Sequence, residues 1–241
     1  MDYSFLQCGE GALTVHLGDG IDPAINRRVT ALQGAIDSAG LRGITDLIPA
    51  YADLTVCYDC TVISAKALQR QLRRLLDSLS VAGQDRRRVF RLPVCYGGDY
   101  GPDLDFVCHH SGLSAQEVIA LHSAPDYLIY MLGFLPGFAY LGGLDPRLHT
   151  PRLDSPRTCI PAGSVGIGGA QTGVYPLASP GGWQLLGRTP VSVFDRQRQE
   201  PILYRAGDLV HFVPISPAEY EEIARAVAAG TYTVQVEEVP V

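Results

Sequence analysis

Glycine and proline crowd the stretch from Gly133 to Pro190, and this feature restricts the fold of the chain more than any other. The two residues punctuate short apolar runs, and few of the segments between them are long enough for a helix. Glycine permits positive φ angles, whereas proline stiffens the adjoining turns. The pattern therefore predicts an all-β barrel or sandwich whose long loops carry the function.

The amino-terminal third has helical periodicity instead. Asp22 suits an N-cap, Pro23 the first helical position and Gly40 a helix stop. A second helix begins at Ser64 and presents a leucine stripe on one face. With one more strand, the order β-α-β-β-α closes a core as a ferredoxin-like split β-α-β sandwich. The expected elements are a strand at 12–16, a helix at 22–40, strands at 44–48 and 54–58, and a helix from Ser64.

A polar run at 83–88 separates these elements from the rest and predicts the domain boundary. We expect a small ferredoxin-like domain at 1–84 and a barrel domain at 85–241 that carries the site. Arg86 to Arg88 is interpreted as a solvated linker in preference to a phosphate-binding patch. The expected elements beyond it are a strand at 89–96, a capped helix from Ser114 to about His122, a strand at 209–213, a helix at 217–229 and a strand at 232–236.

The charge balance excludes several classes of partner. With 25 acidic and 19 basic residues the formal charge is −6, so no general attraction to nucleic acid or anionic membranes is expected. The single lysine, Lys66, does not follow glycines, which excludes a Walker-type phosphate loop. No run reaches the roughly 18 apolar residues of a membrane span, and the amino terminus has no basic, apolar leader. A cytoplasmic location is expected.

Cysteine spacing gives no metal or redox site. Six cysteines at irregular spacing in a cytoplasmic chain predict reduced thiols. Cys57 and Cys60 have C-x-x-C spacing, but no second pair completes a zinc site, and they end a strand-like run instead of opening a helix.

Two familiar catalytic motifs fail on inspection. Ala162 stands where a nucleophile elbow needs glycine, so Ser164 is not expected to be a hydrolase nucleophile. Gln171 stands where a dinucleotide fingerprint needs its third glycine. His122, near the end of the capped helix, is either a site residue or a structural cation at the helix C-terminus.

Arg152 and Arg157 lie in a proline-stiffened loop and are the candidate anion-binding residues, because guanidinium offers a planar fork that stays charged. Backbone N–H groups near 163–165 are candidate donors to the same anion. Structural ion pairs for both arginines, and ordinary core packing for the aromatic residues, remain the alternative. The residues expected to shape the site are Gly137, Phe138, Tyr140, Gly163, Ser164, Tyr175, Gly182 and Trp183, with His122 and Gln171 behind them.

The same segments carry a family resemblance. Gly133-Phe-Leu-Pro-Gly-Phe-Ala-Tyr-Leu-Gly142, Pro161-Ala-Gly-Ser-Val165, Ser179-Pro-Gly-Gly-Trp183 and Gly187-Arg-Thr-Pro190 occur in order within about a hundred residues. In these motifs the chain resembles the KipI/PxpB family, also described as allophanate hydrolase subunit 1-like. The resemblance implies an α+β chain, with the small α/β domain followed by a cyclophilin-like β-barrel.

The resemblance also implies a function. Family members are similar in role to the PxpB component of an ATP-dependent 5-oxoprolinase, which opens 5-oxo-L-proline to L-glutamate together with PxpA-like and PxpC-like (allophanate hydrolase subunit 2-like) subunits. ATP with magnesium is then expected at the level of the complex, with no cofactor bound tightly by this chain and no activity of the chain alone. Inhibition of a sensor histidine kinase, known for some relatives, is the alternative, and a stand-alone binding barrel is a third hypothesis.

Overall fold

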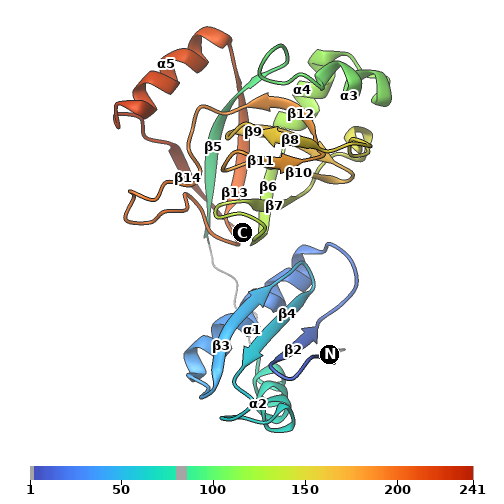
Figure 1. Cartoon of the computed structure of the whole chain (residues 1–241), viewed down its shortest axis with the longest axis vertical. Helices are drawn as coiled ribbons and strands as arrows, with labels where there is room; N and C mark the ends of the chain where they lie inside the picture. Colours follow the sequence, from blue (N-terminus) through green and yellow to red (C-terminus); the bar gives the residue numbers. More distant parts are fainter. Residues whose placement is uncertain (1–2, 80–85, 241) are drawn as a thin grey trace. The chain divides into compact units, whose positions relative to one another are not determined.

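The computed structural model describes residues 3–79 and 86–240. The chain is of the α+β type and divides between Asp85 and Arg86 into two compact units (Figure 1). Residues 80–85, which include the first half of the predicted polar run at 83–88, lie outside the described residues. Within the described ranges, no helix is long and apolar enough to cross a membrane.

The N-terminal unit is a four-stranded antiparallel sheet with two helices on one face (Figure 1). The strand order is β1-β2-β4-β3, so the first strand of the chain lies at an edge beside the second. Leu13 and Val15 of β2 pack with Leu54 and Val56 of β4 against the helices. The elements are β1 (Ser4–Cys8), β2 (Ala12–His16), α1 (Pro23–Ala39), β3 (Ile44–Pro49), β4 (Asp53–Tyr58) and α2 (Ala65–Asp77).

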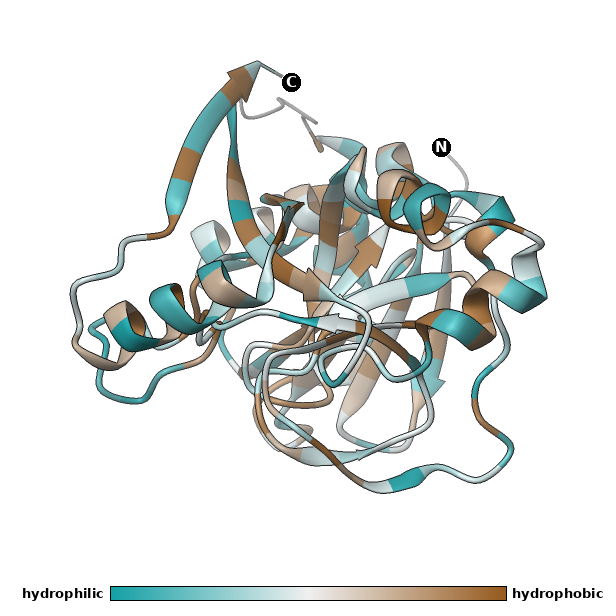
Figure 2. Cartoon of the chain, turned by 90° about the horizontal axis from the view of Figure 1, so that it is seen from above, coloured by the Kyte–Doolittle hydropathy of each residue, from teal (hydrophilic) through white to brown (hydrophobic). Residues whose placement is uncertain are grey.

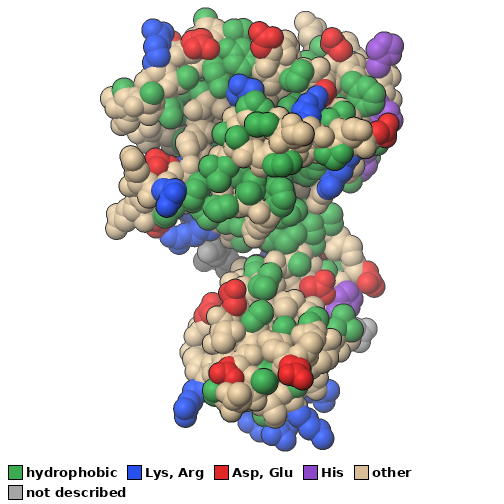
Figure 3. Space-filling view, in the orientation of Figure 1, with side chains coloured by type: hydrophobic (Ala, Val, Ile, Leu, Met, Phe, Trp, Pro, Cys, Tyr) green, Lys and Arg blue, Asp and Glu red, His purple; other side chains and the backbone are tan. Residues whose placement is uncertain are grey.

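Both helices begin where the sequence predicts them. Asp22 Oδ1 accepts a hydrogen bond from the Ala24 N–H at 2.6 Å, and Gly40 ends α1 in the left-handed conformation at φ 55°. Ser64 caps α2 by accepting from the Ala67 N–H at 3.3 Å. The leucine face of α2 is buried in the core, and basic side chains gather on the surface where this helix lies (Figure 3).

The C-terminal unit contains a closed barrel of seven strands in the order β12-β9-β10-β7-β6-β13-β5, with β12 also paired to β5. It is mixed, because β5 and β13 run parallel and the other pairs antiparallel. Strand β14 is added outside the barrel on β5, while β8 and β11 form a separate two-stranded sheet. The glycine and proline pattern predicts a barrel or a sandwich, and the barrel is confirmed.

The bounds of the C-terminal elements are β5 (Arg86–Tyr96), α3 (Leu104–Ser111), α4 (Ala115–Ser123), β6 (Asp126–Leu132), β7 (Ala139–Gly142), the 3₁₀ helix η1 (Pro146–Leu148), β8 (Arg157–Ile160), β9 (Ser164–Gly168), β10 (Gln171–Val174), β11 (Ser179–Gly181), β12 (Gln184–Arg188), β13 (Leu209–Ile215), α5 (Pro217–Ala228) and β14 (Gln235–Pro240). Helix α4 has the predicted capping box, in which Ser114 and Glu117 bond reciprocally.

Two predictions at the ends of this unit are wrong for one physical reason. Arg86 to Arg88 begin strand β5 instead of forming a solvated linker, and the last strand starts at Gln235 instead of Tyr232. The two segments pair antiparallel, so basic side chains of β5 meet acidic side chains of β14 (Figure 2 shows the alternating hydropathy of β14). Arg91 makes a bidentate ion pair with Glu237 at 2.8 and 2.9 Å, and Arg88 makes one with Asp208.

Candidate functional site

A small aromatic cluster lies against the outer face of the barrel. On β9, Val165 and Ile167 point into the barrel core, so Gly166 and Gly168 face the other way. A Cβ on Gly168 would stand 2.3 Å from the Trp183 ring, which shows that the indole covers this strand where only glycine leaves room. The cluster consists of Phe138, Ile160, Tyr175, Trp183 and Leu185.

Next to this cluster is a pocket of about 140 Å³. Its volume is below the roughly 300 to 1,000 Å³ of sites for drug-sized ligands, so it suits a small molecule and is too small for a nucleoside triphosphate. Aromatic rings form most of its wall, and among the described lining residues Arg152 alone is charged. The lining is Phe134, Phe138, Tyr140, Arg152, Tyr175, Pro180, Gly181, Gly182 and Trp183.

Phe138 holds the aromatic wall together. Its ring centre lies 5.3 Å from that of Tyr140, 5.7 Å from that of Tyr175 and 5.6 Å from that of Trp183, each in an edge-to-face arrangement. Such pairs add about 0.5–1.5 kcal/mol each beyond the area they bury. The wall is therefore rigid before any ligand arrives.

Phe134 stands at the pocket in a strained backbone conformation. Its φ is 66°, and no other non-glycine residue among those described has a positive φ. The residue is 66% exposed. The Leu135 N–H donates to the Gly133 carbonyl at 2.7 Å across it, as in a γ-turn of the rare positive-φ type. Strain of this kind costs about 1–3 kcal/mol and concentrates at functional sites.

Arg152 and Tyr175 supply the polar character of the pocket. The guanidinium carbon of Arg152 lies 5.9 Å from the Trp183 ring centre, within cation–π range. Burial raises the pKa of Tyr175, although the Trp183 backbone and then the two nearby arginines oppose the shift. Tyr175 is thus a neutral phenol at pH 7, and its hydroxyl points at β11, where a Cβ on Gly181 would approach it to 2.6 Å.

Arg157 takes a different position from Arg152. Its Nη2 donates to Asp103 Oδ1 at 2.7 Å, and its Nη1 donates to the Trp183 carbonyl at 3.4 Å. The Asp103 carboxylate also accepts from the Leu185 N–H at 2.6 Å, which ties the loop before α3 to β12. Arg157 does not line the pocket, and the expected convergence of both arginines on one anion is replaced by an ion pair. Its anion-binding role stays a prediction.

The predicted N–H donors near Gly163 are occupied. Gly163 N–H donates to the Tyr175 carbonyl at 2.8 Å, and Ser164 N–H donates to the Pro161 carbonyl at 3.3 Å. Val165 belongs to the β9–β10 ladder. The chain's own carbonyls thus take the N–H groups of Gly163 and Ser164, and an anion-binding role for this segment stays a prediction. Ser164 is fully buried, and its Oγ has no hydrogen-bond partner among the described residues.

His122 lies in the barrel core and not in the pocket. Its Nε2 lies 2.7 Å from Thr172 Oγ1, and its Nδ1 lies 2.8 Å from the Tyr96 hydroxyl. Thr172 Oγ1 donates to the Gly166 carbonyl at 3.0 Å, so it accepts from Nε2–H and leaves Nδ1 to accept from Tyr96. Complete burial lowers the pKa of His122 to about 3. The interpretation of His122 as a helix-terminal cation is wrong, because the imidazole is neutral.

Two further predicted residues lie outside the pocket. Gly137 has φ 83° in the turn before β7, and its carbonyl accepts from the Tyr204 hydroxyl at 3.0 Å. Gln171 begins β10 opposite Gly168. The pocket instead gathers six predicted residues: Phe138, Tyr140, Arg152, Tyr175, Gly182 and Trp183.

Sequence reasoning missed Phe134, Pro180 and Gly181. All three belong to the Gly-Phe-Leu-Pro-Gly and Ser-Pro-Gly-Gly-Trp segments that carry the family resemblance, so their spacing to Phe138 and Trp183 was the available signal. Among the described residues, no group of three or more His, Cys, Asp or Glu side chains is arranged to hold a metal ion.

Comparison with known proteins identifies the family. Residues 3–204 match the family described as carboxyltransferase domain, subdomain C and D. A Bacillus subtilis (strain 168) protein described as the B component of 5-oxoprolinase is 42% identical over 228 residues, which are 90% of this chain and 95% of that protein. An Escherichia coli O157:H7 protein of the same description is 46% identical over 208 residues, or 86% and 93% of the two chains.

A solved structure agrees. The crystal structure of TTHA0988 superposes on this chain with a TM-score of 0.75 and 41% sequence identity. The match includes 85% of this chain and 39% of the TTHA0988 chain, so this chain spans about two fifths of TTHA0988. The chain belongs to the carboxyltransferase subdomain C and D family. Within it, the similarity to proteins described as the B component of 5-oxoprolinase confirms the resemblance to the KipI/PxpB group.

Proposed function

We propose that this chain is the PxpB component of an ATP-dependent 5-oxoprolinase complex that hydrolyses 5-oxo-L-proline to L-glutamate in the cytoplasm. The observation that carries the proposal is the 42% identity, across nearly the whole of both chains, to the Bacillus subtilis protein described as the B component of 5-oxoprolinase. The partners are a PxpC-like and a PxpA-like subunit. No observation favours inhibition of a histidine kinase over this role.

The pocket beside Trp183 is the proposed 5-oxoproline site. A planar lactam ring suits the flat aromatic wall, and the substrate carboxylate suits the Arg152 guanidinium at its edge. A volume of about 140 Å³ supports a small cyclic amide as the ligand of this pocket in preference to ATP. ATP with magnesium is therefore held elsewhere in the complex.

The chemistry of the lining supports a binding role. Opening an unstrained lactam requires activation of its amide oxygen, which phosphorylation by ATP supplies when both reactants are held in register. The described lining residues include no carboxylate, imidazole or thiol that would act as base or nucleophile. These groups come from the partner subunits, and the isolated chain is inactive.

The proposal extends to the fold of the two units. The order β1-β2-β4-β3 with two helices on one face supports a ferredoxin-like N-terminal unit in which β1 occupies the edge that the last strand usually takes. The seven-stranded closed barrel supports a cyclophilin-like C-terminal unit. Likeness to cyclophilin carries no isomerase activity with it.

Reconstitution tests the proposal. The chain is purified alone, with a PxpC-like partner, and with both partners, and ATP hydrolysis is measured with and without 5-oxoproline. We expect a stable complex with the PxpC-like chain and 5-oxoproline-dependent ATP turnover only in the full assembly. Robust turnover by the isolated chain would contradict the division of labour, and a full assembly without turnover would reject the substrate.

A further inference from the structure

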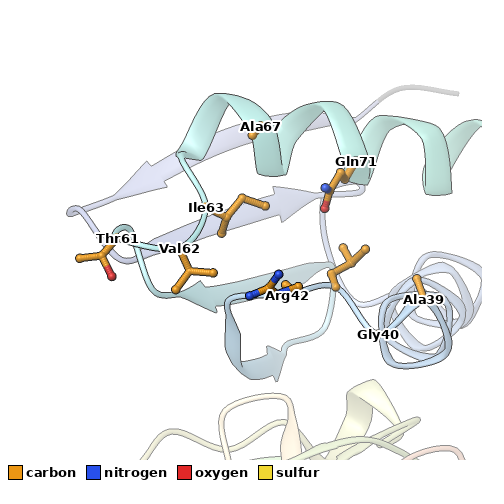
Figure 4. A pocket seen from close by; sticks show the side chains of 9 residues that line it. Ala39, Gly40, Arg42, Thr61, Val62, Ile63, Ala67 and Gln71 are labelled. Carbon is orange, nitrogen blue, oxygen red and sulfur yellow. The ribbon is translucent and has the colours of Figure 1, made fainter.

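The N-terminal unit has a pocket that the proposed function does not use. It measures about 620 Å³ and opens between the C-terminal end of α1 and the first turns of α2 (Figure 4). This volume falls within the usual range for small-molecule and peptide-sized ligands. The lining is Ala39, Gly40, Leu41, Arg42, Thr61, Val62, Ile63, Ala67 and Gln71.

The floor of this pocket is fixed by the packing of two turns. Gly43 has φ 89°, and a Cβ at this position would lie 3.0 Å from side-chain atoms of both Val62 and Ile63. The Asp59 N–H donates to the Gly43 carbonyl at 2.8 Å, and the N–H groups of Val62 and Ile63 donate to the Asp59 carbonyl at 3.0 Å. The pocket therefore exists before a ligand binds.

Two polar side chains line the pocket, one with a buried acceptor that lacks a partner and one with a charge that faces solvent. Gln71 Oε1 is buried and has no hydrogen-bond partner among the described residues. A buried acceptor without a donor costs about 1–3 kcal/mol, so its presence needs an explanation. Arg42 is exposed on the turn between α1 and β3, and within the described ranges its guanidinium makes no hydrogen bond or ion pair.

The rest of the lining is apolar. Val62 is 52% exposed, and Ile63 and Ala67 continue the apolar lining from it toward α2. Figure 4 shows Val62 and Ile63 at one end, with Arg42 below and Gln71 on α2 above. A ligand that satisfies this surface presents an anion, an N–H donor and an apolar group together.

We propose that this pocket binds a carboxylate that carries an amide N–H and an apolar side chain. The carboxylate pairs with Arg42, the Gln71 amide rotates so that its buried Oε1 accepts from the ligand's N–H, and the apolar group covers Val62. N-acyl amino acids and the last residue of a peptide share this chemistry. Because a single N-acyl amino acid fills only part of about 620 Å³, a longer peptide gains additional contacts in the same pocket.

Calorimetric titration of the full-length chain tests the proposal. The probes are N-acetyl-L-leucine, a tetrapeptide with the same free C-terminal leucine, and N-acetyl-L-leucinamide, which lacks the carboxylate. We expect both carboxylates to bind, the tetrapeptide more tightly, and the amide about three- to fivefold more weakly, since an ion pair with the exposed Arg42 is screened by water. Equal binding of both carboxylates assigns the pocket to the small N-acyl amino acid.

Matched variants locate the binding. Arg42→Gln is expected to weaken both carboxylates about three- to fivefold and Gln71→Leu about tenfold. The controls Arg27→Gln and Gln69→Leu, which alter residues outside the lining, leave the affinity unchanged. Gln71→Leu should also raise the melting temperature, because it removes a buried unpaired acceptor; a purely structural Gln71 would lower it.

Two results would overturn the inference. One is that neither carboxylate binds the full chain; the other is that both bind Arg42→Gln and Gln71→Leu as well as they bind the unaltered protein. The proposal does not rest on 5-oxoproline chemistry, so its failure leaves the pocket beside Trp183 and the reconstitution experiment untouched.

Discussion

Substitution of Arg152 and Arg157 tests the proposed binding site, because the two residues lie five positions apart but have different surroundings. Arg152 lines the pocket, whereas Arg157 pairs with Asp103. Arg157→Gln leaves the Asp103 carboxylate, 11% exposed, without its counterion. Loss of one partner costs about 3–5 kcal/mol in a fully buried pair, but Arg157 is 30% exposed, and we expect about 1.5–3 kcal/mol. Arg152→Gln removes a cation–π contact worth about 0.5–1 kcal/mol at an exposed site.

The two free energies predict separate effects in two assays. At roughly 2–4 °C per kcal/mol for a chain of this size, Arg157→Gln lowers the melting temperature by about 3–12 °C and Arg152→Gln by about 1–4 °C. In the reconstituted complex, Arg152→Gln raises the KM for 5-oxoproline about tenfold or more, because the carboxylate loses its charged partner. Arg157→Gln has its main effect on stability.

A double variant checks the ion pair itself. Asp103→Asn combined with Arg157→Gln should destabilise the chain by clearly less than the sum of the single changes, because each single change leaves one charge unpaired. The reasoning is refuted if the two arginine variants melt at the same temperature, or if Arg152→Gln leaves the KM unchanged while Arg157→Gln raises it.

Two further predictions concern the barrel unit. Burial lowers the pKa of His122 from 6.5 to about 3. Between pH 6.5 and pH 3, His122 is therefore protonated in the unfolded chain but neutral in the folded chain. The free energy of unfolding is then unaffected by His122 above pH 6.5 and falls toward pH 3, by up to about 1.4 kcal/mol per pH unit. Urea titrations should show a flatter stability profile between pH 6.5 and 4.5 for His122→Gln, and a parallel profile would contradict the assignment. Phe134→Gly relieves the positive-φ strain that Phe134→Ala keeps, so the glycine variant should be more stable by roughly 1 kcal/mol, although both lose the exposed ring. A glycine variant less stable than the alanine variant would show that the turn is unstrained.

Local sequence patterns, which involve residues within a few positions of each other, correctly predicted the starts of three helices. Asp22, Ser64 and Ser114 are side chains that cap helices within three residues, and their helices begin where expected. Helix α3 was missed because Asp103 makes no side-chain cap; its carboxylate is committed to Leu185 and Arg157 far along the chain. A capping pattern cannot reveal a helix that is held by tertiary contacts.

The same distinction applies to the site. The aromatic residues come from two separate segments, 133–142 and 175–183, that the glycine and proline motifs mark in the sequence, and six of the predicted residues line one pocket. Two other predicted residues are held outside the pocket by partners 50 or more residues away in the sequence. His122 bonds to Thr172, and Arg157 bonds to Asp103. Spacing in a sequence shows which side chains belong to one loop, but it does not show which of them already make a hydrogen bond or an ion pair with a distant residue.

The protonation states in the pocket bear on how the complex works. Arg152 contributes a guanidinium, and burial raises the pKa of Tyr175, which keeps its phenol protonated. Both groups can donate hydrogen bonds, and neither can accept a proton from an attacking water at neutral pH. Donors of this kind hold a carboxylate and polarise a carbonyl, but lactam opening also needs a base and a phosphoryl donor. If this chain binds 5-oxoproline, the partner that supplies those groups must therefore reach the mouth of the same pocket, beside the strained and exposed Phe134.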